Sequence, residues 1–157
     1  MAQAPEPTTP ESDEDFSLLK LENQLCFPLY AASRQLTKAY QPYLRELDPD
    51  LTYPQYLVLL LLWEHQEMTV KELGENLLLD SGTLTPLLKR MEQKQWVSRR
   101  RDPRDERSVI IGLLPAGEGL QKPACSIPKG LLARLEISTK EMATLRRLLD
   151  HVIKKLT

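Results

Sequence analysis

Residues 69–114 read TVKELGENLLLDSGTLTPLLKRMEQKQWVSRRRDPRDERSVIIGLL, and the order of elements within them decides the fold. The stretch opens with Thr69 and Glu72, a capping box that predicts a short helix over about 69–77. A second short helix is predicted over 80–95, because its apolar residues recur at helical spacing: Leu84, Leu87, Leu88 and Met91.

Two strand-like runs follow, WVSRRR at 96–101 and SVIIGLL at 108–114, and the charged turn DPRDER joins them. Two short helices and then a two-stranded ribbon is the order of a winged helix-turn-helix, whose second helix enters the major groove of DNA. We therefore predict a mainly α fold with a small β-wing (α+β). Pro86 would break a helix that starts at Ser81 unless it is locally strained, so the start of this recognition helix stays open by a few residues.

Long helical segments flank this stretch. Residues 17–47 carry apolar side chains at helical spacing, and Pro28 and Pro42 are expected to kink or divide that run. Residues 53–65 are apolar almost all round, which predicts a buried helix with Thr52 as its N-cap residue.

The last segment begins with another capping box, Ser138 and Glu141, before an apolar seam spaced alternately three and four residues apart. A seam of about two heptads is too short to stand alone. We expect it to pack against a helix of a second subunit in a homodimer, and packing within one subunit is the alternative. The seam consists of Met142, Leu145, Leu149, Val152 and Leu156.

The 157 residues are enough for one domain with a sizeable core. The net charge of −1 conceals an asymmetry, since residues 1–16 hold five acidic and no basic residues and the remainder carries +4. This proline-rich head is predicted to be a disordered acidic tail. Residues 17–157 then form a single domain, with the winged helix-turn-helix at about 53–115 and dimerisation helices at about 17–47 and 116–157.

Several classes of protein are disfavoured. The head lacks the basic and apolar regions of a signal peptide, and the apolar run LVLLLLW at 57–63 is too short to span a bilayer. There is no zinc spacing and no glycine-rich phosphate loop, so neither a metal nor a cofactor is expected. Two cysteines, Cys26 and Cys125, without an export signal are typical of a reducing cytoplasm, where a structural disulfide is not expected.

Residues 89–107 form a local positive patch, with eight cations against four anions. Hydroxyls and long cations on the recognition helix suit the major groove, and arginines at the ribbon tip can reach the narrow minor groove. The alternative is a charged turn that is merely solvated, and the helix–helix–ribbon order argues against it. The residues predicted to bind DNA are Ser81, Thr83, Thr85, Lys89, Arg90, Arg99, Arg101, Arg104 and Arg107.

Residues 69–120 resemble the MarR family of dimeric winged-helix regulators, and DPRDERS resembles the wing motif of that family closely. LENQLCF at 21–27, LTYPQYLVLLLLWE at 51–64 and LLLDSGTLTPLLKRME at 77–92 resemble one branch, the organic-hydroperoxide-sensing repressors OhrR. The match covers about 18–120 and is looser beyond. It implies a homodimeric repressor that binds a twofold-related operator of double-stranded DNA in the bacterial cytoplasm, associated with the nucleoid when bound, beside a peroxidase gene for organic hydroperoxides.

The same resemblance assigns roles to single residues. Cys26, in LENQLCF, would be the peroxide sensor, and the tyrosines that hydrogen-bond its thiolate from the partner subunit map onto Tyr40 and Tyr53. Tyr30 matches a further tyrosine of some members. In the wing, Arg107 would make the minor-groove contact, with Asp105 beside it to orient the guanidinium.

The chemistry of a thiol agrees with this assignment, although composition alone favours a buried inert cysteine. The thiolate is the nucleophile, and phenol hydroxyls that donate to sulfur favour the charged form. Leu25, Phe27 and Leu29 around Cys26 would favour alkyl or fatty-acid hydroperoxides over hydrogen peroxide. Oxidation gives a sulfenic acid, which would break the tyrosine contacts and release DNA.

Cys125 leaves two routes open after that first oxidation. Some OhrR proteins pair the sensor with a second, late cysteine in an intersubunit disulfide, and Cys125 would be this resolving cysteine, although it lies before Ile127-Pro128 rather than after it. Alternatively, a low-molecular-weight thiol such as bacillithiol or glutathione caps Cys26.

Three rival functions remain. The first is a repressor of the same family that a small phenolic ligand releases, with Cys26 a bystander. The second is a thiol peroxidase, which would leave the basic wing unexplained and lacks the usual arginine and proline-rich loop around its cysteine. The third is a protein-interaction module that binds no DNA at all. We predict a regulator rather than an enzyme.

Overall fold

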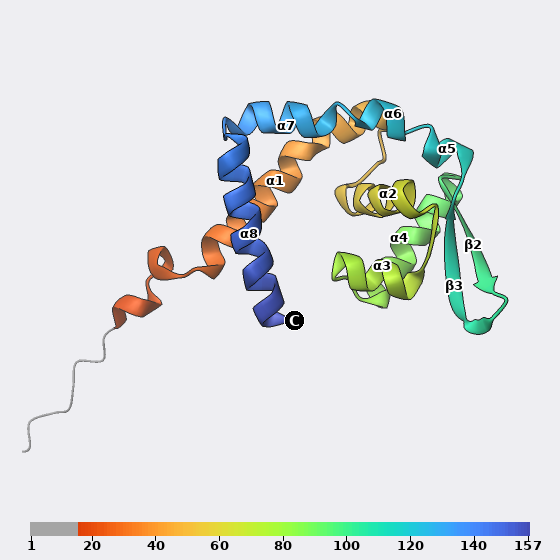
Figure 1. Cartoon of the computed structure of the whole chain (residues 1–157), viewed down its shortest axis with the longest axis horizontal. Coiled ribbons are helices and arrows are strands. Elements are labelled where there is room, and N and C mark those ends of the chain that lie inside the picture. The colour runs from red at the N-terminus through yellow and green to blue at the C-terminus, as the bar shows by residue number, and fades with distance from the viewer. Residues whose placement is uncertain (1–15) are drawn as a thin grey trace, which may run out of the picture. The chain divides into compact units, whose positions relative to one another are not determined.

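The computed structural model describes residues 16–157 (Figure 1). The predicted acidic tail at 1–16 lies outside the described residues except for Phe16. The chain divides into two units, residues 1–36 and 37–157, which we call the N-terminal unit and the main unit and describe separately.

The N-terminal unit contains two 3₁₀ turns, Phe16–Leu19 and Leu21–Asn23, and the first half of α1 (Cys26–Leu47). The apolar spacing predicted a helix that starts near residue 17, but α1 begins only at Cys26. Pro28 is the third residue of α1, where a missing N–H costs no helical hydrogen bond. Pro42 lies inside α1 and does not divide it, so of the two predicted effects, a kink or a division, division does not occur at this proline.

The core of the main unit is built around α2 (Tyr53–His65), as predicted. Val58, Leu59 and Leu62 are fully buried. Pro54, Glu64 and His65, near the two ends of the helix, are exposed, and so is Leu60 in its middle, at 41%. α3 (Val70–Leu77) and α4 (Ser81–Gln93) both pack against α2 and add Leu73, Leu84, Leu88 and Met91 to the same core.

A three-stranded antiparallel sheet of order β1-β3-β2 completes this core: β1 is Glu67–Thr69, β2 is Val97–Asp102 and β3 is Asp105–Leu113. The sequence did not predict β1, because three residues are too few to show an alternation. β3 begins earlier than the predicted residue 108, so most of DPRDER is strand and only Pro103 and Arg104 connect the hairpin. In Figure 1 this hairpin extends away from α2, α3 and α4.

The chain after the sheet is helical: α5 (Pro115–Glu118), α6 (Gln121–Ala124), α7 (Ile127–Leu135) and α8 (Thr139–Leu156). The indole N–H of Trp63 donates to the carbonyl oxygen of Gly117 at 3.0 Å, which ties α5 to α2. A Cβ on Gly117 would lie 2.3 Å from the carbonyl oxygen of Trp96, so only glycine fits there.

α8 starts at the predicted capping box, since the amide of Glu141 donates to Ser138 Oγ at 3.3 Å and the amide of Ser138 donates to Glu141 Oε2 at 2.8 Å. The hydroxyl of Ser138 also donates to Glu141 Oε2, at 2.6 Å, and this hydrogen bond, followed by that from the Ser138 amide, lowers the pKa of Glu141. No residue of α8 is buried in the single chain, and Leu145 is 49% exposed. Its apolar seam therefore lacks a complete partner within the main unit.

Candidate nucleic-acid interface and thiol site

The start of the recognition helix α4 is fixed by Asp80. Its Oδ1 accepts the backbone N–H of Thr83 at 2.9 Å and its Oδ2 accepts the Thr83 hydroxyl at 2.8 Å. The hydrogen bond from the Thr83 hydroxyl, followed by that from its amide, lowers the pKa of Asp80. This cap lets α4 start at Ser81 and continue through Pro86, which resolves the question that the sequence left open.

The two faces of α4 are cleanly separated. Leu84, Leu88 and Met91 point into the core, whereas the predicted DNA-binding residues of the helix are all exposed: Ser81, Thr83, Thr85, Lys89 and Arg90. The hydroxyl of Thr85 donates to the carbonyl oxygen of Ser81 at 2.7 Å. The hydroxyls of Thr83 and Thr85 thus both donate their protons to acceptors at the start of α4. Each hydroxyl oxygen can still accept a hydrogen bond from a base amino group.

The wing tip is shaped by two aspartates that bond to backbone amides. Asp102 Oδ1 accepts the N–H of Arg104 at 2.9 Å, and Asp105 Oδ1 accepts the N–H of Arg107 at 3.1 Å. Asp105 thus holds the backbone of Arg107, and the guanidinium of Arg107 pairs with no carboxylate among residues 16–157. Arg101 donates from Nη1 to the carbonyl oxygen of Glu106 at 2.7 Å, across the hairpin.

Three of the eight cations in 89–107 are paired with acids. Arg99 lies 3.6 Å from Glu92, Arg100 lies 2.7 Å from Glu67, and Lys94 bridges Asp48 and Asp50. Arg99 is also partly buried, and its Nε has no hydrogen-bond partner among the described residues. The other five carry no ion pair within residues 16–157: Lys89, Arg90, Arg101, Arg104 and Arg107.

Tyr40 and Tyr53, the predicted thiolate partners, lie side by side in the main unit with ring centroids 4.8 Å apart. Tyr56, which the sequence analysis did not single out, is 5.9 Å from Tyr40, and its i+3 spacing from Tyr53 on one helix was the available signal. Burial, and then the nearby Tyr53 and Tyr56, raises the pKa of Tyr40 to about 12. Burial also raises the pKa of Tyr53. These phenols therefore keep their protons at neutral pH and can donate hydrogen bonds.

Cys125 acts electrostatically on one member of this tyrosine cluster. The pKa of Tyr56 is raised by burial, then by Tyr53, and then by Cys125, so the thiol is close enough to act electrostatically on the ring hydroxyl. Cys125 is an exposed free thiol whose Sγ is 3.6 Å from the carbonyl oxygen of Gln121. A shallow pocket of about 620 Å³ opens beside it, lined by Lys122, Pro123, Ser126 and Lys129.

Cys26 and Tyr30 belong to the N-terminal unit. Cys26 is the first residue of α1 and is an exposed free thiol. Tyr30, one turn later, accepts a hydrogen bond from Arg34 Nη1 at 2.7 Å, and the guanidinium of Arg34 lies 5.5 Å from its ring centroid. The hydroxyl oxygen of Tyr30 is thus an acceptor within its own helix, and this hydrogen bond does not use the hydroxyl proton.

Metal sites and membrane spans are both absent from the described part of the chain. Residues 16–157 contain no cluster of three or more histidine, cysteine, aspartate or glutamate side chains that would hold a metal ion. No helix among them is long and apolar enough to cross a membrane.

Comparison with known proteins supplies the family. Residues 51–109 match the model of the MarR family. The chain is 50% identical over 144 residues to the organic hydroperoxide resistance transcriptional regulator of Bacillus subtilis (strain 168), an alignment that covers 92% of this chain and 97% of that protein.

Two solved structures of AbfR, a protein of Staphylococcus epidermidis, are also similar. Reduced AbfR bound to DNA superposes with a TM-score of 0.76 at 37% identity, covering 89% of this chain and 96% of AbfR. Disulfide-formed AbfR superposes with a TM-score of 0.58 at 36% identity, covering 93% and 96%. With this fold, this exposed recognition helix and a relative that is half identical along its length, the chain belongs to the MarR family.

Proposed function

We propose that the protein is a homodimeric transcriptional repressor that binds operator DNA when reduced and releases it when an organic hydroperoxide oxidises Cys26. The DNA-binding part of this proposal rests on the surface that α4 and the wing form in the main unit. α4 and the wing together present hydroxyls and five cations that no carboxylate among the described residues neutralises. The DNA-bound state of reduced AbfR supports it.

The helix and the wing of this surface contact different grooves of the DNA. The exposed face of α4 enters the major groove, where Thr83 and Thr85 offer acceptors and Lys89 and Arg90 offer donors to base edges and phosphates. Arg107, whose backbone is held by Asp105, reaches from the wing into the minor groove. Arg99 contributes less than its charge suggests, because Glu92 already pairs with it.

A second copy of the chain completes the molecule. The apolar seam of α8 and the apolar residues before α1 are too exposed for a stable single chain: Leu18 is 72% and Leu25 68% exposed. Burying them in a symmetric dimer places two recognition helices on two half-sites. The dimer works in the cytoplasm, on the nucleoid.

The sensor uses the tyrosine cluster of the partner subunit. Tyr40 and Tyr53 are protonated at neutral pH, well below their raised pKa values, so both can donate to a thiolate at Cys26 that docks there in the dimer. The thiolate attacks the terminal oxygen of the hydroperoxide, the S–O bond forms as the O–O bond breaks, and the alkoxide that leaves takes a proton from solvent water to become the alcohol. The product is a sulfenic acid on Cys26.

Cys125 then resolves this sulfenic acid. Its thiolate attacks the Cys26 sulfur, an S–S bond forms, and the hydroxyl leaves as water. The electrostatic effect of Cys125 on Tyr56, a member of the cluster where Cys26 of the partner would dock, supports this step, and so does the existence of disulfide-formed AbfR. On a non-reducing gel, hydroperoxide should convert wild type to a linked dimer but leave Cys125→Ser as single chains. A mass increase of one glutathione or bacillithiol on wild type, without a linked dimer, would assign the step to a small thiol.

The experiment that tests DNA recognition is selection of binding fragments from a random-sequence pool by the reduced protein. We expect a twofold-related pair of half-sites about one helical turn apart. Recovery of no preferred sequence, even at low salt, would favour a protein-interaction module. Loss of binding on adding a phenol, without any oxidant, would instead favour a ligand-released repressor.

A further inference from the structure

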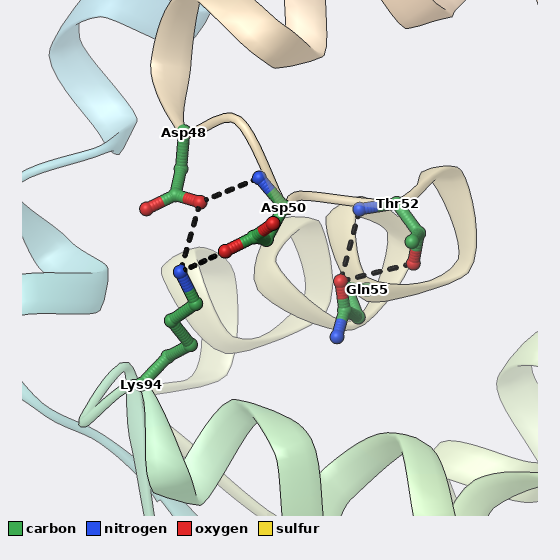
Figure 2. Close-up of polar contacts among 5 residues, drawn as sticks. All are labelled: Asp48, Asp50, Thr52, Gln55 and Lys94. Carbon is green, nitrogen blue, oxygen red and sulfur yellow. Dashed lines mark hydrogen bonds and ion pairs between the residues drawn. The ribbon is translucent and has the colours of Figure 1, made fainter.

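The C-terminal end of the recognition helix is tied to the loop between α1 and α2. Lys94, the C-cap residue of α4, places its Nζ 2.5 Å from Asp50 Oδ2 and 3.4 Å from Asp48 Oδ1 (Figure 2). The two acids also hold each other's conformation, because Asp48 Oδ1 accepts the backbone N–H of Asp50 at 2.8 Å.

The loop is a firm anchor for this lysine. The amide of Leu51 donates to the carbonyl oxygen of Asp48 at 3.0 Å, and Leu51 itself is buried. Immediately after it, the N–H and the hydroxyl of Thr52 both donate to Oε1 of the buried Gln55, each at 2.9 Å (Figure 2). Hydrogen bonds and burial therefore fix both ends of the loop, and Lys94 attaches α4 to a part of the fold that is already ordered.

The positive charge of Lys94 is paired with the carboxylates of Asp48 and Asp50. The hydrogen bond with Asp50, and then that with Asp48, raises the pKa of Lys94 and keeps it protonated. Its Nζ also lies 5.8 Å from the ring centroid of the buried Trp96, which limits how far the side chain can swing. Lys89 and Arg90, one turn earlier on α4, have no such acidic partner among residues 16–157.

We propose that Lys94 is a positioning residue for operator binding: it fixes the C-terminal end of α4 on the α1–α2 loop and makes no contact with DNA phosphate. The proposal rests on the proposed DNA-binding function. By sequence, Lys94 lies five residues after Lys89 and would be counted among the cations that face the DNA groove. The proposal excludes Lys94 from that set.

The salt dependence of operator binding tests the proposal, because removal of one phosphate-binding cation lowers the slope of log affinity against log salt by about 0.9. The variants are Lys94→Gln, Asp50→Asn and, as matched control, Lys89→Gln, all measured as reduced full-length protein on the selected operator. For Lys89→Gln in a dimer we expect the slope to fall by about 1.8. For Lys94→Gln we expect the wild-type slope and an affinity about twofold to fivefold lower, the range of an exposed ion pair.

The Asp50→Asn variant distinguishes a positioning role of Lys94 from a phosphate contact, because the two roles predict opposite changes in operator affinity. A positioning role predicts that it weakens binding as Lys94→Gln does, and that the double variant is no weaker than either single one. A phosphate contact predicts that freeing Lys94 strengthens binding and steepens the slope. A lower slope in Lys94→Gln, or tighter binding in Asp50→Asn, overturns the proposal. Failure of the wild type to prefer any sequence would be a failure of the proposed function, and is recognised without any variant.

Discussion

In the winged-helix region, residues 51–114, apolar side chains bury against one another within one chain, whereas in α8 and before α1 they stay exposed. Leu59 and Leu88 are fully buried, while Leu18 is 72% and Leu145 49% exposed. The DNA-binding surface is thus built by a single chain. In the proposed dimer, a second copy covers the segments flanking this region, which carry Cys26 and the apolar seam. A repressor that senses through its dimer would show this division.

The largest effect on this contrast should come from Leu59→Ala. The side chain is fully buried in α2, so its removal should lower the free energy of unfolding by about 2–5 kcal/mol. Chemical denaturation followed by circular dichroism measures it. Leu60→Ala, the neighbouring exposed leucine, is the matched control, and an equal loss in both variants would mean that α2 is not the centre of the core.

Leu145→Asp should break the dimer while leaving the fold of the single chain intact. A half-exposed leucine of α8 is replaced by a charge that must be desolvated in the proposed interface. We expect the dimer dissociation constant to rise at least about tenfold in sedimentation equilibrium. Arg146→Asp, the adjacent exposed position, should change it much less. Unchanged association of Leu145→Asp would place the interface elsewhere.

Arg107→Gln should weaken operator binding without altering stability. The guanidinium carries no ion pair among the described residues, so its loss costs about 1–3 kcal/mol of binding free energy. Fluorescence anisotropy on the selected operator measures the change. Arg147→Gln removes the same charge from exposed α8 and should bind the operator nearly as tightly as wild type. Equal losses of affinity in the two variants would mean that Arg107 acts only through the net charge of the protein and not through a specific contact.

The smallest effect should appear at high pH in the tyrosine cluster. The pKa of Tyr40 is about 12, above its ordinary value of 10.0, so its contribution to stability is complete below pH 10 and is lost as the pH rises through 12. The loss of stability over this interval should be less steep in Tyr40→Phe than in wild type. Ultraviolet absorbance of phenolate, recorded alongside denaturation, should show one fewer late-titrating tyrosine in the variant. Identical curves would mean that Tyr40 is not buried as the structure has it.

The sequence predicted the winged-helix region better than its surroundings, for physical reasons. Thr52 and Thr69 were predicted as N-cap residues and were confirmed, because their partners lie only three residues away and local spacing indicates where such helices start. The apolar positions of α4 repeat with the helical period and were confirmed as core, and the almost wholly apolar α2 was confirmed as a buried helix. Strand β1 was missed because only its pairing with β3 distinguishes it from a loop.

The candidate site was less accessible to sequence reasoning, because charge pairing is a matter of tertiary structure. Lys94 meets Asp50, 44 residues away, and Arg100 meets Glu67, 33 residues away, and no local pattern reports either pair. Tyr56 joined Tyr40 and Tyr53 in the structure although it was not among the tyrosines that the family resemblance mapped, Tyr30, Tyr40 and Tyr53. The roles of Cys26 and Arg107 stay predictions, since they concern a partner subunit and DNA.

The most direct test is operator binding by the reduced wild type and by Cys26→Ser, each with and without an alkyl hydroperoxide. We expect the wild type to release the operator in hydroperoxide and to rebind it after reduction by dithiothreitol, while Cys26→Ser stays bound throughout. Release of both proteins, or of neither, would contradict a sensing role for Cys26 and leave the exposed thiol at the start of α1 without a function in this switch.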